Sequence, residues 1–352
     1  MKLSDLREFV LRNRKRIIVV ATLFIFLCIV SVVGYQKFLA PPLIPEEEKL
    51  PPFYLVNDIA SVTGEVSLSS LQVTDFPGVI TAYRAEPLAF SFTKEEAKEL
   101  AARFGFSGEP RISTSPDGRS ETLVFIDLKN QATLAVTTKP RKLTYVVEGG
   151  RAQEGTLLDQ AAATQKAKEF VGDKDLPLSQ LSPFGVRYLI SKGNIYFEVE
   201  EPTEAEFLEV SFSWLVEGWD LLGESPADTV ARVIFDRQGK VVSLKFRFPD
   251  LQFTRFGEVK LLSSSEAVAK LKKEGLVVST SAIGTTTGWS EIADLRSFAP
   301  ESVRLIFVQP SGATFLYPVY LFEGKGRTTA GVEVKAAAYL LAVSPEYLKA
   351  KE

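Results

Sequence analysis

Two stretches of the chain, 93-TKEEAKELAARFG-105 and 263-SSSEAVAKLKKEG-275, begin and end with the same residue types. Each opens with a hydroxyl residue, Thr93 or Ser263, and has a glutamate three positions later, which is the pattern of a helix capping box. Each then carries apolar residues at helical spacing and ends at a glycine, which readily terminates a helix. Corresponding positions lie 170 residues apart, so the pattern predicts two amphipathic helices in a repeated unit. Helix ends share a common chemistry, and this alone would produce part of the match.

The chain between and after these helices changes to a period of two. Residues 195–199, 208–216 and 242–248 alternate apolar and polar side chains, which is typical of antiparallel strands with one face in water. A further helix is expected in the alanine-rich stretch 156–171. The predicted fold class is therefore α+β: an N-terminal transmembrane helix followed by repeated units, each with one helix packed on an antiparallel sheet.

The N-terminal region predicts a membrane anchor. Residues 17–34 contain no charge, and four basic residues lie between positions 12 and 16. A transmembrane helix at 17–35 would place the lipid bilayer among the partners, the N-terminus in the cytoplasm and the body outside, in a single-pass protein of the plasma membrane. A cleaved signal peptide, or a lipoprotein modified at Cys28, are the alternatives. The predicted domains are a basic tail (1–16), a transmembrane helix (17–35), a Pro/Glu-rich stalk (36–52) and three α+β units (53–150, 151–260 and 261–352).

Composition excludes several classes of site. The chain has no histidine, and its single cysteine, Cys28, lies in the predicted membrane segment. Zinc, copper, haem and iron–sulfur sites in the body are therefore not expected, and we predict no metal or cofactor, although oxygen ligands for calcium remain available. The formal net charge is −3, so the chain has no nucleic-acid signature and no such partner is expected.

Two patterns could carry chemistry. Ser91 and Lys94 match S-x-x-K, in which a lysine activates a serine, but we find no K-T-G element to accompany them. Six glutamates lie between Glu198 and Glu209; they are interpreted as a solvated loop, with an acidic partner-binding patch or an ion site as alternatives. We therefore predict no catalytic residues.

Two tryptophans are candidates for contact with a partner. Trp219 lies where the strand alternation of residues 208–216 ends, and Trp289 lies in a polar stretch. An exposed aromatic side chain at either position could contact a protein or a glycan. A place in the core is the alternative for both residues.

The order of helix, strand, turn and strand, with the phrases DRQGKVVSL at 236–244 and YPVYLF at 317–322, resembles PepSY-type domains. It is also similar to the YycH/YycI-type regulators of bacterial sensor kinases. The resemblance implies a non-catalytic bacterial envelope protein. We therefore expect a membrane-anchored extracytoplasmic binding or regulatory module that contacts another envelope protein. A cell-envelope hydrolase using Ser/Lys or paired carboxylates, and a structural subunit of a surface assembly, are the alternatives.

Overall fold

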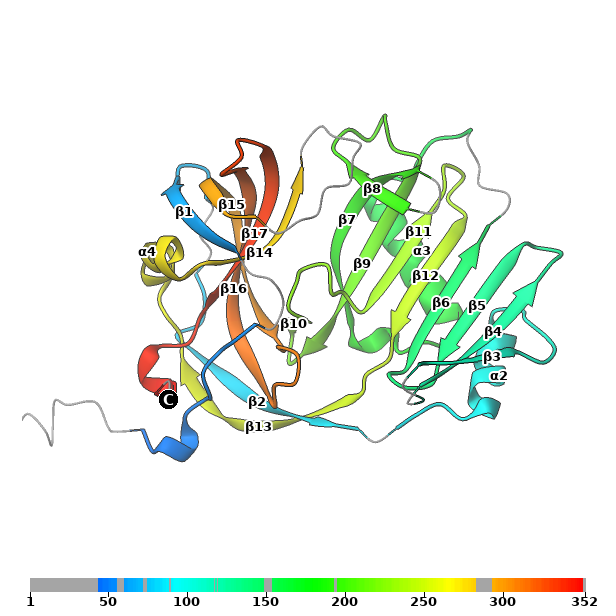
Figure 1. Ribbon diagram of the computed structural model, residues 1–352, viewed down its shortest axis with the longest axis horizontal. Coiled ribbons are helices and arrows are strands. Elements are labelled where there is room, and N and C mark those ends of the chain that lie inside the picture. Colours follow the sequence, from blue (N-terminus) through cyan, green and yellow to red (C-terminus); the bar gives the residue numbers. More distant parts are fainter. Residues whose placement is uncertain are drawn as a thin grey trace, which may run out of the picture. The chain divides into compact units, whose positions relative to one another are not determined.

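The computed structural model (Figure 1) describes nearly all of the chain beyond residue 43. The chain divides into two units, residues 1–47 and 48–352, and the strands and α-helices of the described part all belong to the second unit. A short 3₁₀ helix, η2 (Glu46–Glu48), spans the division. The described residues are 44–55, 60–71, 75–88, 90–116, 118, 120–148, 154–192, 195–282 and 293–350.

The predicted single-pass plasma-membrane protein requires correction. Within the described ranges, no helix is long and apolar enough to cross a bilayer. The three α-helices found there have 10, 14 and 11 residues, whereas a span needs about 20. The predicted tail, the transmembrane helix at 17–35 and the stalk up to residue 43 lie outside the described residues.

The middle of the chain forms one antiparallel sheet of nine strands, which continues through the boundary predicted at residue 150. Strand β6, from the first predicted unit, pairs with β12 from the second, so that Tyr145 lies opposite Leu244. Their buried faces therefore form one layer rather than two separate cores. In spatial order the strands are β3 (Arg111–Thr114), β4 (Glu121–Asp127), β5 (Ala132–Thr137), β6 (Lys142–Val147), β12 (Val241–Arg247), β11 (Ala231–Phe235), β9 (Phe207–Val216), β7 (Leu181–Lys192) and β8 (Ile195–Val199).

Two helices pack on this sheet (Figure 1). Helix α2 (Lys94–Arg103) contacts β4, and α3 (Gln160–Asp173) contacts β7 and β9. In the chain, α2 precedes β3 to β6 and α3 precedes β7 to β9. The short helix η3 (Leu178–Gln180) leads from α3 into β7. The alternation of residues 208–216 predicts a wet face, but almost all of β9 is buried. Helix α3 packs on the strand, and the polar side chains of Glu209, Ser211 and Ser213 are hydrogen-bonded to Arg187, Gly185 and Asp220.

Five of the remaining strands form a closed ring. In this ring β1 (Ala60–Val66) pairs with β14 (Leu276–Ala282), β14 with β17 (Glu333–Leu341), β17 with β16 (Phe315–Thr328), and β16 with β15 (Leu295–Val308). Strand β15 then pairs back with β1 in parallel. The ring closes tightly at Gly64, where a Cβ atom would lie 1.6 Å from the carbonyl oxygen of Arg296. Helix α4 (Ser264–Glu274) packs on β1 and β17.

Two connections join the sheet and the ring. Strand β10 (Trp219–Leu222) pairs with β9 on the sheet side and with β15 on the ring side. The long strands β2 (Val79–Pro87) and β13 (Leu251–Lys260) form a ribbon, and β2 also pairs with β16. The C-terminal helix η4 (Pro345–Tyr347) is followed by Leu348, which bridges to Leu50.

The three helices predicted beyond the stalk are found, the alanine-rich one at Gln160–Asp173 in place of 156–171, but the repeated α+β fold is wrong. Both capping boxes form, at Thr93 with Glu96 and at Ser263 with Glu266. The strands that follow are arranged differently, since β3 pairs with the next strand, β4, whereas β14 pairs with the last strand, β17, and with β1. Capping is decided by neighbouring residues, whereas strand pairing depends on which edges distant segments leave open. The described part is a mainly β structure with seventeen strands and three α-helices.

Candidate binding groove

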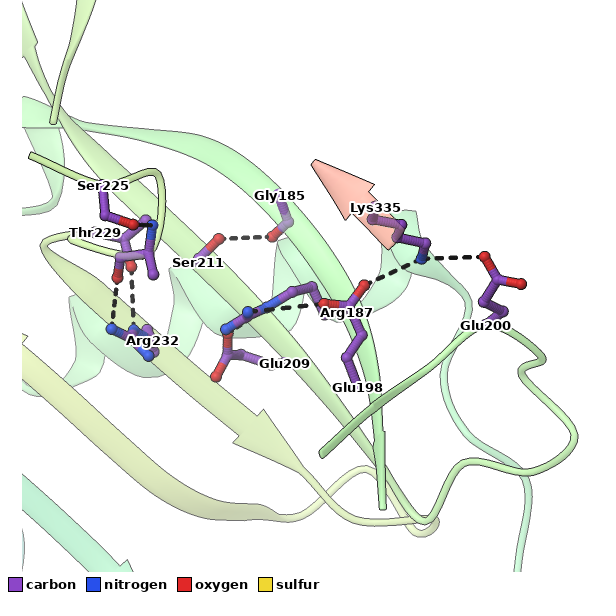
Figure 2. A network of polar contacts seen from close by, with 11 residues as sticks. Gly185, Arg187, Glu198, Glu200, Glu209, Ser211, Ser225, Thr229, Arg232 and Lys335 are labelled. Carbon is purple, nitrogen blue, oxygen red and sulfur yellow. Dashed lines mark hydrogen bonds and ion pairs between the residues drawn. The ribbon is translucent and has the colours of Figure 1, made fainter. Parts of the chain in front are cut away.

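A groove of about 440 Å³ lies between β7 of the sheet and the ring strands β14 to β17. The hollow exists because small residues line much of it, since their side chains leave the space between the strands unfilled. Charged side chains stand among them, and Figure 2 shows part of their network. The small lining residues are Gly185, Ser211, Ala227, Ser279, Ser281, Gly324, Ala336 and Ala337.

Two strand edges face this groove. The four consecutive residues 184–187 of β7 line it, as do Glu301 and Ser302 of β15. The strand pairing shows that each of these segments lies on an open edge. Strand β7 pairs with β8 only from Tyr188 onward. Strand β15 pairs with β1 only as far as Phe298, and with β10 only from Phe307.

Both edges carry features that oppose strand addition. In β7, Pro183 is followed by a register shift that leaves Phe184 as the extra residue of a bulge. In β15, Pro300 is followed by a shift that leaves Glu301 as the extra residue. Proline lacks the N–H that a new strand would need, and a bulge twists the edge away. Each edge therefore resists pairing with the other edge and with an incoming strand.

Arg304 connects the two edges. Its Nη2 lies 2.8 Å from Glu323 Oε2, and its Nη1 donates a hydrogen bond of 3.2 Å to the carbonyl oxygen of Phe184. The guanidinium also lies 4.1 Å from the centroid of the Phe184 ring, which is a cation–π contact. The Phe184 carbonyl therefore points toward β15, and the groove is held at a fixed width on this side.

A second set of charges connects β7, β8, β9 and β17 (Figure 2). Arg187 Nε donates to Glu209 Oε1 at 3.0 Å, and Glu209 is buried. Glu198 lies 3.8 Å from Arg187 and 3.2 Å from Lys335, whose Nζ is also 3.8 Å from Glu200. Burial lowers the pKa of the Arg187 guanidinium, but Glu209 and Glu198 outweigh it and the pKa is raised. Arg187 therefore stays charged, and its charge is balanced.

The ring side of the groove also offers groups without partners. Within the described residues, no ion pair is formed by Glu301 or Lys325, and both side chains are exposed. The hydroxyls of Ser279, Ser281 and Ser302 likewise make no hydrogen bond to another described residue. A ligand in the groove would thus meet one free anion, one free cation and three hydroxyls.

The six glutamates of the predicted acidic loop lie in different surroundings. Glu198 and Glu209 belong to the charge network, and Glu206 accepts a hydrogen bond from the Ser191 amide at 3.2 Å. With Glu200, which lies 3.8 Å from Lys335, three of these carboxylates therefore join the groove network, a role that the sequence pattern does not indicate. Their partners Arg187 and Lys335 are on β7 and β17, and only the fold brings them together.

The other predicted site residues that the structure describes do not line the groove. Lys94 at the start of α2 pairs with Glu109 at 3.4 Å, and Thr93 caps the helix. Trp219 is half-buried in β10 and packs against the core. Trp289 lies outside the described residues. A contact with a partner at either tryptophan stays a prediction.

No protein-family model matches the chain, and no curated protein matches it. The chain is similar in structure to an uncharacterized protein from Eubacterium rectale, with a TM-score of 0.51 and 11% sequence identity. The match covers 81% of this chain and 91% of the other chain. At this identity the likeness shows the fold alone. The resemblance to PepSY-type and YycH/YycI-type proteins stays a prediction.

Proposed function

We propose that this protein is a non-catalytic binding module whose groove contacts a polar, charged segment of a partner protein. The observation that carries the proposal is the pair of facing edges, each with a proline followed by a bulge. These features keep a space open that two unprotected edges would tend to close by pairing. A partner would be recognised by side chains rather than by strand addition.

The charges of the groove support a polar partner. Most are paired within the protein, so their side chains are already ordered before a partner arrives, which lowers the entropic cost of binding. The lining residues Arg187, Arg304, Lys325 and Lys335 carry four positive charges, and Glu198, Glu301 and Glu323 carry three negative charges. A nearly neutral lining favours a partner segment that carries both signs of charge.

Site-specific photocrosslinking in the native cell tests the proposal. A photoreactive residue at Ser281, inside the groove, should give an adduct of one defined mass. The same residue at Thr254, which is exposed on β13, is the matched control and should not give that adduct. The double variant Glu301→Gln, Lys325→Gln removes the unpaired charges without touching the internal pairs and should weaken the adduct at Ser281. An adduct that forms equally from both positions, or that survives the double variant unchanged, contradicts the proposal.

A further inference from the structure

A second cavity, of about 890 Å³, lies on the other side of the loop that follows β10. Residues of the β9–β10 hairpin, the start of β13 and the turn after β15 surround it. Ala227 and Thr229 line the groove, whereas Asp228 between them lines this cavity. The loop is therefore the wall between two separate hollows.

Part of the cavity lining is apolar. Leu221 and Leu222 of β10 and Trp214 of β9 are buried lining residues, and Leu251 and Phe253 of β13 are half-buried ones. The size lies within the usual range for small-molecule sites, which is about 300–1,000 Å³. A ligand with an apolar face could contact these residues.

The lining also includes planar polar groups that hydrogen bonds to the backbone hold in place. Asp228 Oδ2 accepts a hydrogen bond from the Ser225 amide at 3.1 Å. Gln309 Nε2 donates to the Ala313 carbonyl at 3.3 Å, and the backbone N–H of Gln309 donates to the carbonyl oxygen of Leu222. Buried Glu224 accepts from the Ser311 amide at 2.7 Å. Each side chain is thus oriented before a ligand enters.

The charge of the lining restricts the ligand further. Glu224, Asp228 and Asp250 carry three negative charges, and Arg247 carries the single positive charge among the lining residues. A phosphate or carboxylate group would be repelled, whereas hydroxyl groups can donate to the carboxylates and amides. A saccharide ring combines an apolar C–H face with a rim of hydroxyls, which matches a lining that has both apolar side chains and fixed polar groups.

We propose that this cavity is a binding site for saccharides that lack acidic groups. The site is independent of the groove. Calorimetric titration of the full chain with tetra-N-acetylchitotetraose, cellotetraose and an acidic tetragalacturonate tests it. At least one of the two uncharged oligosaccharides should bind, and the acidic one should bind at least tenfold more weakly than that sugar.

Two variants place the binding in the cavity. Asp250→Asn removes a charge whose side chain makes no hydrogen bond to another described residue, and Gln252→Trp fills the mouth from an exposed position. Each should weaken saccharide binding at least fivefold, with an unchanged thermal midpoint. Lys325→Gln in the groove is the control and should leave binding unchanged. The proposal is overturned if neither uncharged sugar binds, if the acidic sugar binds as well as they do, or if binding survives both cavity variants.

Discussion

Helices α2 and α4 begin with the same set of hydrogen bonds but pack on different kinds of β structure. In each, the cap hydroxyl accepts from the glutamate amide, and the glutamate carboxylate accepts from the cap amide. Helix α2 lies on the nine-stranded sheet, whereas α4 lies on the closed ring, in contact with β1. The start of a helix is therefore decided within four residues, and its surroundings are decided by segments far away in the chain.

The largest effect is expected where the ring closes. Gly64→Ala would place a Cβ atom 1.6 Å from the backbone oxygen of Arg296, and a backbone atom can move only if β1 and β15 separate. We expect a loss of more than about 4 kcal/mol in the free energy of unfolding, measured by urea denaturation. Gly78→Ala is the matched control, because no atom lies within 4 Å of its added Cβ. Equal losses in the two variants would mean that ring closure does not depend on Gly64.

Truncating the buried leucine of each helix should have the next largest effect. Leu271 of α4 is fully buried and Leu100 of α2 is 5% exposed. Each change to alanine should cost about 2–5 kcal/mol, because it removes buried methyl groups and leaves a cavity. Chemical denaturation of both variants measures the comparison. A loss below about 1 kcal/mol at Leu100 alone would show that the sheet side repacks more easily than the ring.

Removing the caps should have a smaller and more uniform effect. Thr93→Ala and Ser263→Ala each remove the acceptor for a glutamate amide at a helix start, and each should cost about 0.5–2 kcal/mol. Thr93→Ser keeps the acceptor and should retain most of the stability. Since the two caps share the hydrogen bonds between the cap residue and the glutamate, the two losses should be of similar size. Losses of clearly different size would show that the sheet and the ring transmit the change differently.

This contrast explains which parts of the fold are readable from the sequence. The capping boxes and the helices that they start follow from a few adjacent residues, such as Thr93 with Glu96. The alternation of residues 242–248 also identifies strand β12. The ring could not be predicted, because β1 pairs with β14 and β15 across more than 200 residues. The alternation within a strand does not indicate which strand it pairs with. The match between the two helices at a spacing of 170 therefore suggested a repeat, because nothing in the sequence showed that the strands after them pair differently.

The groove could not be predicted from the sequence either, because segments far apart in the chain form it. Its carboxylate Glu198 belongs to an acidic run that reads as a solvated loop, and its cations Arg187 and Lys335 are unremarkable by position. Pro183 and Pro300 were the available signal, since a proline inside a strand pattern indicates an edge or a bulge. That two such edges face each other is a property of the fold, and no local pattern contains it.

The smallest expected effect concerns the titration of the two capping glutamates. Hydrogen bonds from the Thr93 amide and hydroxyl lower the pKa of Glu96, and those from the Ser263 hydroxyl and amide lower the pKa of Glu266. A carboxylate whose pKa is lowered on folding contributes stability above its unfolded pKa, about 4.3 for glutamate, and loses it as the pH falls through the lower folded value. Glu96→Gln and Glu266→Gln can keep a capping hydrogen bond but cannot titrate. The stability of the wild-type protein relative to each variant should therefore be constant from pH 8 to about pH 5 and should decline below it for both helices. Urea denaturation across this pH range measures the difference. A decline for Glu266 without one for Glu96 would mean that the shared capping hydrogen bonds act differently on the ring and on the sheet, and the comparison between the two helices would fail at its most local level.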